Sequence, residues 1–233
     1  NADVISVAQE AGKTCIQVFF YRSKQNWGNQ SYFPLHDKSH TAEEVLTSFI
    51  IQFYENKNAP TEIILNKKIR DLDLIKVALE KKEEKFISIK ISTKGNSLKL
   101  SKMAEKNAKE ALTRKIFESE TNIKLLNEVA DKFKLNISPR TIEVYDNSHI
   151  QGSNSVGALI TFASEGFVKK QYRKFNIKNK ELNAGDDYGM LKEVFLRRFS
   201  RIIKNKKQTD VIIPELVIID GGKGQYSVGR KVL

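Results

Sequence analysis

This chain is poor in cysteine and has no long apolar run. Its single cysteine, Cys15, among 233 residues rules out an internal disulfide and a zinc site built on several cysteines. No apolar stretch approaches the roughly 18 residues that a membrane-spanning helix needs, and no signal peptide opens the chain. We therefore expect a cytoplasmic protein that does not enter a membrane. Because the first residue is Asn1, we expect a piece of a longer polypeptide.

Acidic residues are outnumbered by basic ones. The chain has 28 Asp and Glu residues and 40 Lys and Arg residues, which gives a formal net charge of +12 and a pI near 9.6. Such an excess favours a polyanionic partner. A membrane-surface helix would concentrate the basic residues in one amphipathic segment. Here they are spread along the chain, so nucleic acid is the favoured partner.

The two halves of the chain show the same order of predicted elements: strand, strand, strand, helix, strand, helix. In the first half, the predicted strands are 3–9, 14–22, 30–35, 60–66 and 85–92, with helices from the capping box at Thr41 and over 69–81. In the second half, the predicted strands are 141–148, 155–163, 168–177 and 214–220, with helices over 185–203 and from 221.

Three antiparallel strands followed by crossover helices is the order of the ribonuclease H-like fold. The segment 60–66, Pro-Thr-Glu-Ile-Ile-Leu-Asn, also echoes 214–220, Pro-Glu-Leu-Val-Ile-Ile-Asp. We therefore predict an α/β protein with two ribonuclease H-like units in tandem, each a mixed sheet flanked by helices, the second truncated at its C-terminus. The predicted domains are 1–97, a helical connector 98–139 that breaks near 119–122, and 140–233.

Two aspartates in the second half end apolar strands. Asp146 follows the alternating strand that contains Ile142 and Val144, and Asp220 follows the apolar run 216–219. Ligands of open α/β sheets bind at this edge. Two carboxylates on neighbouring strands repel unless a divalent cation lies between them, and hard oxygen ligands suit Mg²⁺ or Mn²⁺. Taken singly, each aspartate could instead belong to a polar turn.

A third acid is expected from the helix over 185–203. Asp186 and Asp187 open it, and one of them could simply be its N-cap. If Tyr188 and Leu191 pack on the sheet, the helix N-terminus brings Asp187 toward Asp146 and Asp220. Three acids could then hold one or two metal ions that activate water and cleave a phosphodiester. The first half has Asn66 where the second has Asp220, so its copy of the site is predicted to be degenerate.

Basic and aromatic side chains near these acids are candidate DNA contacts. An aromatic ring can stack on a base, and cations contact phosphates. Backbone N–H groups at the start of the last helix could also face a phosphate. His149 is more often a solvent-exposed or hydrogen-bonded residue than a ligand. The candidate set is His149, Lys169, Lys170, Tyr172, Arg173, Arg197, Arg198 and Lys223.

Four stretches together resemble the UvrC family of bacterial nucleotide excision repair nucleases. They are Tyr-Asp-Asn-Ser-His (145–149), Tyr-Arg-Lys-Phe-Asn-Ile (172–177), Gly-Asp-Asp-Tyr (185–188) and Ile-Asp-Gly-Gly-Lys-Gly-Gln (219–225). The resemblance implies a ribonuclease H-like endonuclease that makes the 5′ incision in damaged double-stranded DNA with Mg²⁺ or Mn²⁺. It also implies that Asp146, Asp187 and Asp220 are catalytic metal ligands, and that UvrB binds a segment outside this chain.

The chain departs from the family pattern in two respects. Asn147 stands where the family often has an apolar residue, which we expect to change packing rather than chemistry. The family's catalytic histidine lies further downstream than residue 233, as does its helix-hairpin-helix pair, and its N-terminal nuclease is also missing here. These departures leave open whether this piece is active by itself.

Two other functions fit parts of the sequence. An actin-like phosphotransferase also duplicates this α/β unit, but it needs glycine-rich phosphate hairpins, and Gly12 and Gly152 are isolated. A non-catalytic DNA-binding or scaffold module would use the acids only to cap turns. The predicted role of the first half within the nuclease is likewise that of a scaffold or DNA platform.

Overall fold

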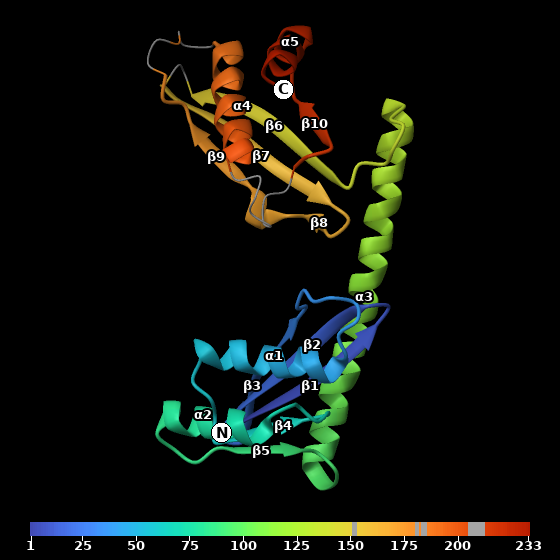
Figure 1. Cartoon of the computed structure of the whole chain (residues 1–233), viewed down its shortest axis with the longest axis vertical. Coiled ribbons are helices and arrows are strands. Elements are labelled where there is room, and N and C mark those ends of the chain that lie inside the picture. Colours follow the sequence, from blue (N-terminus) through green and yellow to red (C-terminus); the bar gives the residue numbers. More distant parts are fainter. Residues whose placement is uncertain (151–152, 180–181, 183–185, 205–212) are drawn as a thin grey trace. The chain divides into compact units, whose positions relative to one another are not determined.

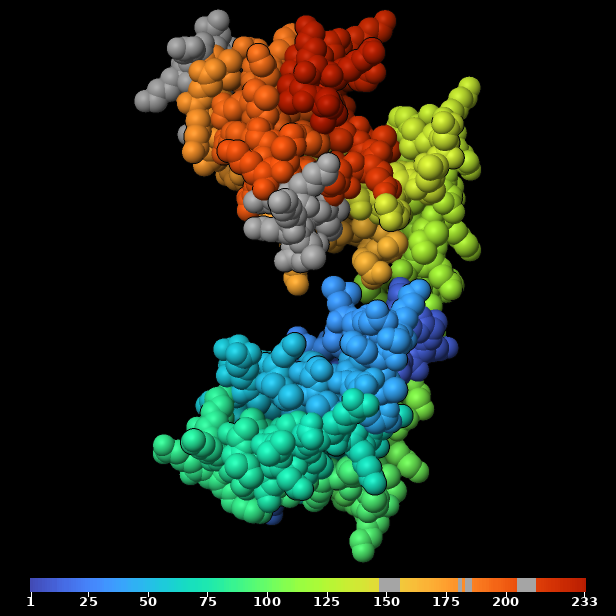
Figure 2. Space-filling model, in the orientation of Figure 1, coloured from blue at the N-terminus to red at the C-terminus, as the bar shows by residue number. Residues whose placement is uncertain are grey.

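The computed structural model describes residues 1–150, 153–179, 182, 186–204 and 213–233. It divides into two compact units, Asn1–Phe117 and Glu118–Leu233 (Figure 1; Figure 2). Each unit contains one mixed sheet with helices packed on it. Among the described helices, none combines the length and the apolar character that crossing a membrane requires.

The first unit is built on a five-stranded sheet in the order β3-β2-β1-β4-β5. Strands β1 to β3 are antiparallel neighbours, whereas β4 pairs parallel to β1 and β5 parallel to β4. The elements are β1 (Ala2–Glu10), β2 (Lys13–Arg22), β3 (Gln25–Tyr32), α1 (Ala42–Glu55), β4 (Glu62–Leu65), α2 (Leu72–Glu83) and β5 (Ser88–Ile91). The predicted capping box begins α1, because Thr41 and Glu44 cap each other's backbone N–H.

Both faces of this sheet are covered. Helices α1 and α2 pack on the face that carries Ile5 and Leu65. The long helix α3 (Gly95–Phe133) packs on the other face through Ala104 and Ala108, whose small side chains let the helix approach β1 closely. Both side chains are fully buried.

Helix α3 is continuous over 39 residues, so the predicted break at 119–122 was wrong. Two polar side chains in that segment find a partner outside the helix. Ser119 Oγ and Asn122 Nδ2 both donate to the carbonyl oxygen of Ser164, at 3.3 Å each. Such residues usually end a helix by bonding to its backbone in place of the helical hydrogen bonds. Here the side chains bond to Ser164 instead, so the helical bonds stay intact.

The second unit is built on a sheet in the order β10-β6-β7-β8, with β9 also paired to β7. Its elements are β6 (Thr141–Ile150), β7 (Ser153–Ala163), β8 (Gly166–Phe167), the 3₁₀ turn η1 (Lys169–Gln171), β9 (Arg173–Asn176), α4 (Asp187–Lys204), β10 (Leu216–Ile219) and α5 (Lys223–Val232). The single strand predicted over 168–177 is therefore divided by a turn. In that turn Gln171 N donates to Val168 O at 2.9 Å instead of to a neighbouring strand.

The two sheets share one strand order. The path β3-β2-β1-β4 of the first unit corresponds to β9-β7-β6-β10 of the second, with the same parallel and antiparallel pairings. Two tandem units of the ribonuclease H-like order are thereby confirmed. The second core lies between the sheet and α4, and its buried members are Tyr145, Leu159, Phe175, Leu191, Val194 and Phe195.

Candidate active site

Asp146 and Asp220 lie side by side on two neighbouring strands: Asp220 directly follows β10, whereas Asp146 lies within β6, which continues to Ile150, so the expectation that Asp146 ends its strand was wrong. Strands β6 and β10 are parallel, and their register pairs Tyr145 with Ile219, the residues just before the two aspartates. Asp220 N donates to Tyr145 O at 3.0 Å, which extends the ladder by one residue. Both aspartates are exposed. The prediction that their strands are neighbours is therefore confirmed.

The residues that precede the two aspartates point into the core. Tyr145 and Ile219 pack into the core beneath α4, where the Tyr145 and Phe195 rings lie 4.7 Å apart. Because side chains alternate along a strand, Asp146 belongs to the opposite face, whereas Asp220 follows the last residue of β10. Two carboxylates of like charge in register are costly to keep together without a cation or hydrogen-bond donors.

The N-terminus of α4 lies toward the same end of the sheet. Asp186 caps it, since its Oδ1 accepts a hydrogen bond of 2.9 Å from Gly189 N, and Asp187 is the first helical residue. The Tyr188 ring lies against Gly224, four positions after Asp220: a Cβ added to this glycine would be 2.4 Å from the ring. Asp187 thus opens a helix whose first turn lies against the segment that follows Asp220.

The donor chemistry of these three aspartates suits a hard divalent cation, because carboxylate oxygens are the ligands that Mg²⁺ and Mn²⁺ prefer. The in-register pair on β6 and β10 supplies two of them on neighbouring strands. Over the residues that the structure describes, no three His, Cys, Asp or Glu side chains are close enough together to hold a metal ion. The role of Asp146, Asp187 and Asp220 as ligands stays a prediction.

A buried ion pair that sequence reasoning missed fixes α4 on the sheet. Glu143 is fully buried, and its carboxylate accepts from Arg198 Nε at 3.1 Å, from Arg198 Nη2, and from the Tyr145 hydroxyl at 2.5 Å. Burial and the Glu143 charge raise the pKa of Tyr145. Burial alone would lower the pKa of Arg198, but its hydrogen bond to Glu143 and the charge of that residue raise it. No local sequence signal indicates this pair, because Arg198 lies 55 positions after Glu143.

The candidate DNA contacts fall into distinct groups. Lys169, Lys170 and Lys223 are exposed, and Tyr172 is half-buried. Arg173 is also half-buried, and its Nη1 donates to the carbonyl oxygens of Lys170 and Tyr172.

The remaining candidates are less accessible or lie outside the description. Arg197 is held by the Asn176 carbonyl oxygen and by Glu193, over the Phe175 ring. Arg198 is buried with Glu143 rather than on the surface where a phosphate contact was expected. The His149 side chain falls within 147–155, outside the described part of the structure.

The first unit has no carboxylate at the positions that correspond to the aspartates. Its register pairs Ile5 with Leu65, so Ser6 and Asn66 take the places of Asp146 and Asp220. The Asn66 amide accepts from Val7 N and donates to Val7 O, both at 3.0 Å, and Ser6 Oγ donates to Ser101 O in α3. The predicted degenerate copy therefore has its polar groups engaged within the fold.

An aspartate of β1 also escaped the sequence analysis. Asp3, 1% exposed, accepts from Arg22 Nη1 at 2.7 Å and from the Tyr54 hydroxyl at 2.8 Å. It occupies the same position on β1 that Glu143 occupies on β6, two residues before the register pair. Both units therefore bury an acid and a tyrosine at this point and pair the acid with an arginine, which is buried in the second unit and half-buried in the first.

Comparisons with known proteins give a consistent result. Residues 1–115 match the family model "UvrC Ribonuclease H-like domain", and residues 130–233 match "UvrC RNAse H endonuclease domain". Two curated relatives named UvrABC system protein C cover the whole chain. The one from Chelativorans sp. (strain BNC1) is 45% identical over 245 residues, and the one from Ruegeria sp. (strain TM1040) is 46% identical over 234 residues.

The chain spans 38% and 37% of the length of these two relatives. Among solved structures, a Bacteroides thetaiotaomicron protein with an actin-like ATPase fold is 8% identical, with a TM-score of 0.23 over 98% of this chain and 86% of that one. A TM-score of that size does not establish a common arrangement. The two adjoining family models and the relatives that match from end to end place this chain in the UvrC family, across its two tandem ribonuclease H-like domains.

Proposed function

We propose that this chain is the central and nuclease portion of an enzyme of bacterial nucleotide excision repair. Its second unit hydrolyses a phosphodiester of damaged double-stranded DNA on the 5′ side of the lesion. The observation that carries this proposal is the in-register pair Asp146 and Asp220 on neighbouring parallel strands, in a segment that matches the endonuclease domain of the family.

In this proposal Asp146, Asp187 and Asp220 hold Mg²⁺ or Mn²⁺. Such a cation, when bound, stabilises negative charge on the phosphate and lowers the pKa of a water molecule. The chain's part is to hold three carboxylates at the sheet edge. The strand pairing of β6 with β10 sets two of them, and the Glu143–Arg198 ion pair sets the position of α4, which carries Asp187.

The exposed Lys169, Lys170 and Lys223 contact DNA phosphates in this proposal, and Tyr172 and His149 are further candidate contacts. The net charge of +12 supports a DNA partner. The first unit serves as a scaffold or DNA platform, since Ser6 and Asn66 replace the acids there. UvrB binds a segment of the longer protein outside this chain, and the protein works in the cytoplasm.

The adjacent aspartates Asp186 and Asp187 allow a matched test in the full-length protein. Asp187→Asn and Asp220→Asn each remove a proposed ligand, so the 5′ incision should fall by at least about a hundredfold while the other incision and DNA affinity persist. Asp186→Asn removes the same charge one residue away but keeps a good N-cap, so it should cut normally.

Incision is measured on a duplex with a single defined lesion and both ends labelled, over a range of Mg²⁺ and Mn²⁺ concentrations. Normal 5′ cutting by Asp220→Asn, or equal losses in Asp186→Asn and Asp187→Asn, would contradict the proposed ligand set. Loss of DNA binding together with both incisions would favour a binding or scaffold role instead.

A further inference from the structure

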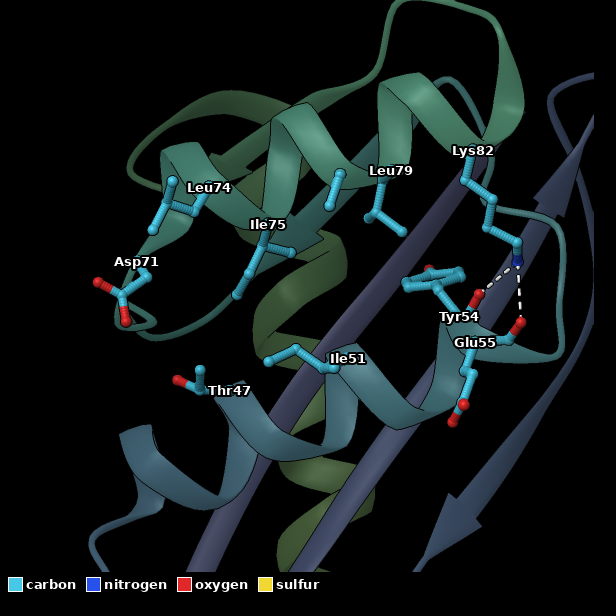
Figure 3. A pocket seen from close by; sticks show the side chains of 10 residues that line it. Thr47, Ile51, Tyr54, Glu55, Asp71, Leu74, Ile75, Leu79 and Lys82 are labelled. Carbon is cyan, nitrogen blue, oxygen red and sulfur yellow. Dashed lines mark hydrogen bonds between the residues drawn. The ribbon is translucent and has the colours of Figure 1, made fainter.

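An open apolar groove lies between α1 and α2 of the first unit (Figure 3). Its volume is about 610 Å³, within the range of roughly 300–1,000 Å³ usual for binding clefts. Ile75, Leu79 and Tyr54 contribute to its buried lining. Ile51 and Leu74 stand at its mouth, 54% and 70% exposed, and such large aliphatic side chains gain free energy when a partner covers them.

The corresponding helices of the second unit pack closely against each other. There α4 packs directly on α5, and a Cβ added to Gly229 would lie 3.1 Å from the Phe195 ring. Gly229 corresponds to Ala78 of α2, because each is the seventh residue after the N-cap of its helix. Ala78 lines the groove. The same fold thus has a closed helix pair in one unit and an open one in the other.

The groove is held open by contacts at both ends. At one end Lys82 Nζ donates to the carbonyl oxygens of Tyr54 and Glu55, at 2.5 and 3.1 Å, as Figure 3 shows. At the other end Arg70 N donates to Thr47 Oγ1 at 3.1 Å. A site that is already formed does not spend binding free energy on ordering itself.

The charge of the lining indicates the kind of partner. Glu55 and Asp71 lie along the groove, and within the described part of the chain neither carboxylate has an ion-pair or hydrogen-bond partner. Lys82 is the one cation of the lining, and backbone carbonyls at the end of α1 hold its ammonium group. The lining therefore offers apolar surface with two free negative charges, which repels nucleic acid and attracts Lys or Arg.

We propose that this groove is the docking site for an amphipathic helix of a partner protein, whose aliphatic side chains enter between α1 and α2 and whose Lys or Arg residues pair with Glu55 and Asp71. Helix-in-groove recognition of this type uses apolar anchors at i, i+3, i+4 and i+7. A second copy of this chain fits poorly, because two-fold pairing of groove with groove would bring the same two acids face to face without a free cation.

The test uses three fluorescein-labelled peptides of about 20 residues, long enough to form helix. The first has leucines at i, i+3, i+4 and i+7 with flanking lysines, the second has the same composition with the leucines scattered around the helix, and the third has glutamates in place of the lysines. Binding to the chain is measured by fluorescence anisotropy. The first peptide should bind at least about tenfold more tightly than either of the others.

Variants connect that binding to the groove. Leu74→Ser should weaken the first peptide about tenfold, and Glu55→Lys combined with Asp71→Lys should weaken it about tenfold and shift the preference to the glutamate peptide. Leu35→Ser is the matched apolar control, since Leu35 is 99% exposed in the same unit and outside the groove. It should bind as the unchanged chain does.

The proposal fails if none of the peptides binds, if the scattered peptide binds equally, or if Leu74→Ser and Leu35→Ser behave alike. It also fails if the chain sediments as a dimer that Leu74→Ser dissociates, because the groove would then be an interface between copies. Preferential binding of a lesion-free DNA duplex to the groove, lost in Leu74→Ser, would contradict it as well.

Discussion

The buried Glu143–Arg198 pair gives the most quantitative prediction. Replacing Arg198 by Met keeps much of the side-chain volume but leaves the Glu143 carboxylate fully buried, and among the described residues only the Tyr145 hydroxyl then remains as its partner. Removing one partner of a buried ion pair typically costs about 3–5 kcal/mol. We therefore expect Arg198→Met to destabilise the second unit by an amount in that range.

Native-state hydrogen exchange measured by mass spectrometry reports on this unit alone, because peptides from β6 and α4 can be followed separately. A loss of about 3 kcal/mol corresponds to a fall in protection of more than about a hundredfold. Arg201→Met is the control on the same helix, since Arg201 is exposed, and it should change protection by less than about threefold.

A second substitution separates the lost ion pair from lost packing. Glu143→Gln in the Arg198→Met background removes the uncompensated charge, so it should restore a large part of the protection. If Arg198→Met lowers protection by less than about tenfold, or if Glu143→Gln restores nothing, the ion pair does not hold α4 on the sheet as we infer.

Three further predictions concern other parts of the fold. Tyr54→Phe removes one of the hydrogen-bond donors to buried Asp3 and should lower the free energy of unfolding of the first unit by about 1–3 kcal/mol in urea titrations; no change would mean that water or Arg22 replaces the donor. Burial raises the pKa of the Cys15 thiol to about 11, so the unfolded chain loses this proton first as pH rises. The stability of the first unit should therefore fall between about pH 8.5 and 11. The fall should be less steep in Cys15→Ala, and equal slopes in the two proteins would refute the assignment. Gly224→Ala places a Cβ against the Tyr188 ring and should lower the melting temperature, with a loss of about 1–3 kcal/mol that Tyr188→Ala relieves; an unchanged melting temperature would show that the ring moves freely.

Much of the architecture is local enough to predict from sequence. Thr41 and Glu44 predict the start of α1, because a capping box involves residues that are only three positions apart. The apolar runs before Asp146 and Asp220 indicate neighbouring strands, and the register of β6 with β10 agrees, although β6 continues past Asp146 to Ile150. The repeated order of elements was sufficient to indicate two similar sheets.

Other features depend on partners far along the chain. A glutamate between two apolar residues normally points to solvent, and only the fold brings Arg198 to Glu143. Ser119 and Asn122 look like a helix break until the carbonyl of Ser164 is placed beside them. The spacing of α1 and α2 likewise follows from contacts such as Lys82 with the end of α1, which no periodic pattern encodes.

The central claim is that three aspartates of the second unit hold a divalent cation. Anomalous diffraction from a crystal of this chain soaked in Mn²⁺ tests it most directly. The account predicts a manganese peak within coordinating distance of the Asp146 and Asp220 carboxylates, with Asp187 as a further ligand, and no such peak in Asp220→Asn. Manganese bound only elsewhere, or no peak at this sheet edge at millimolar Mn²⁺, would contradict it.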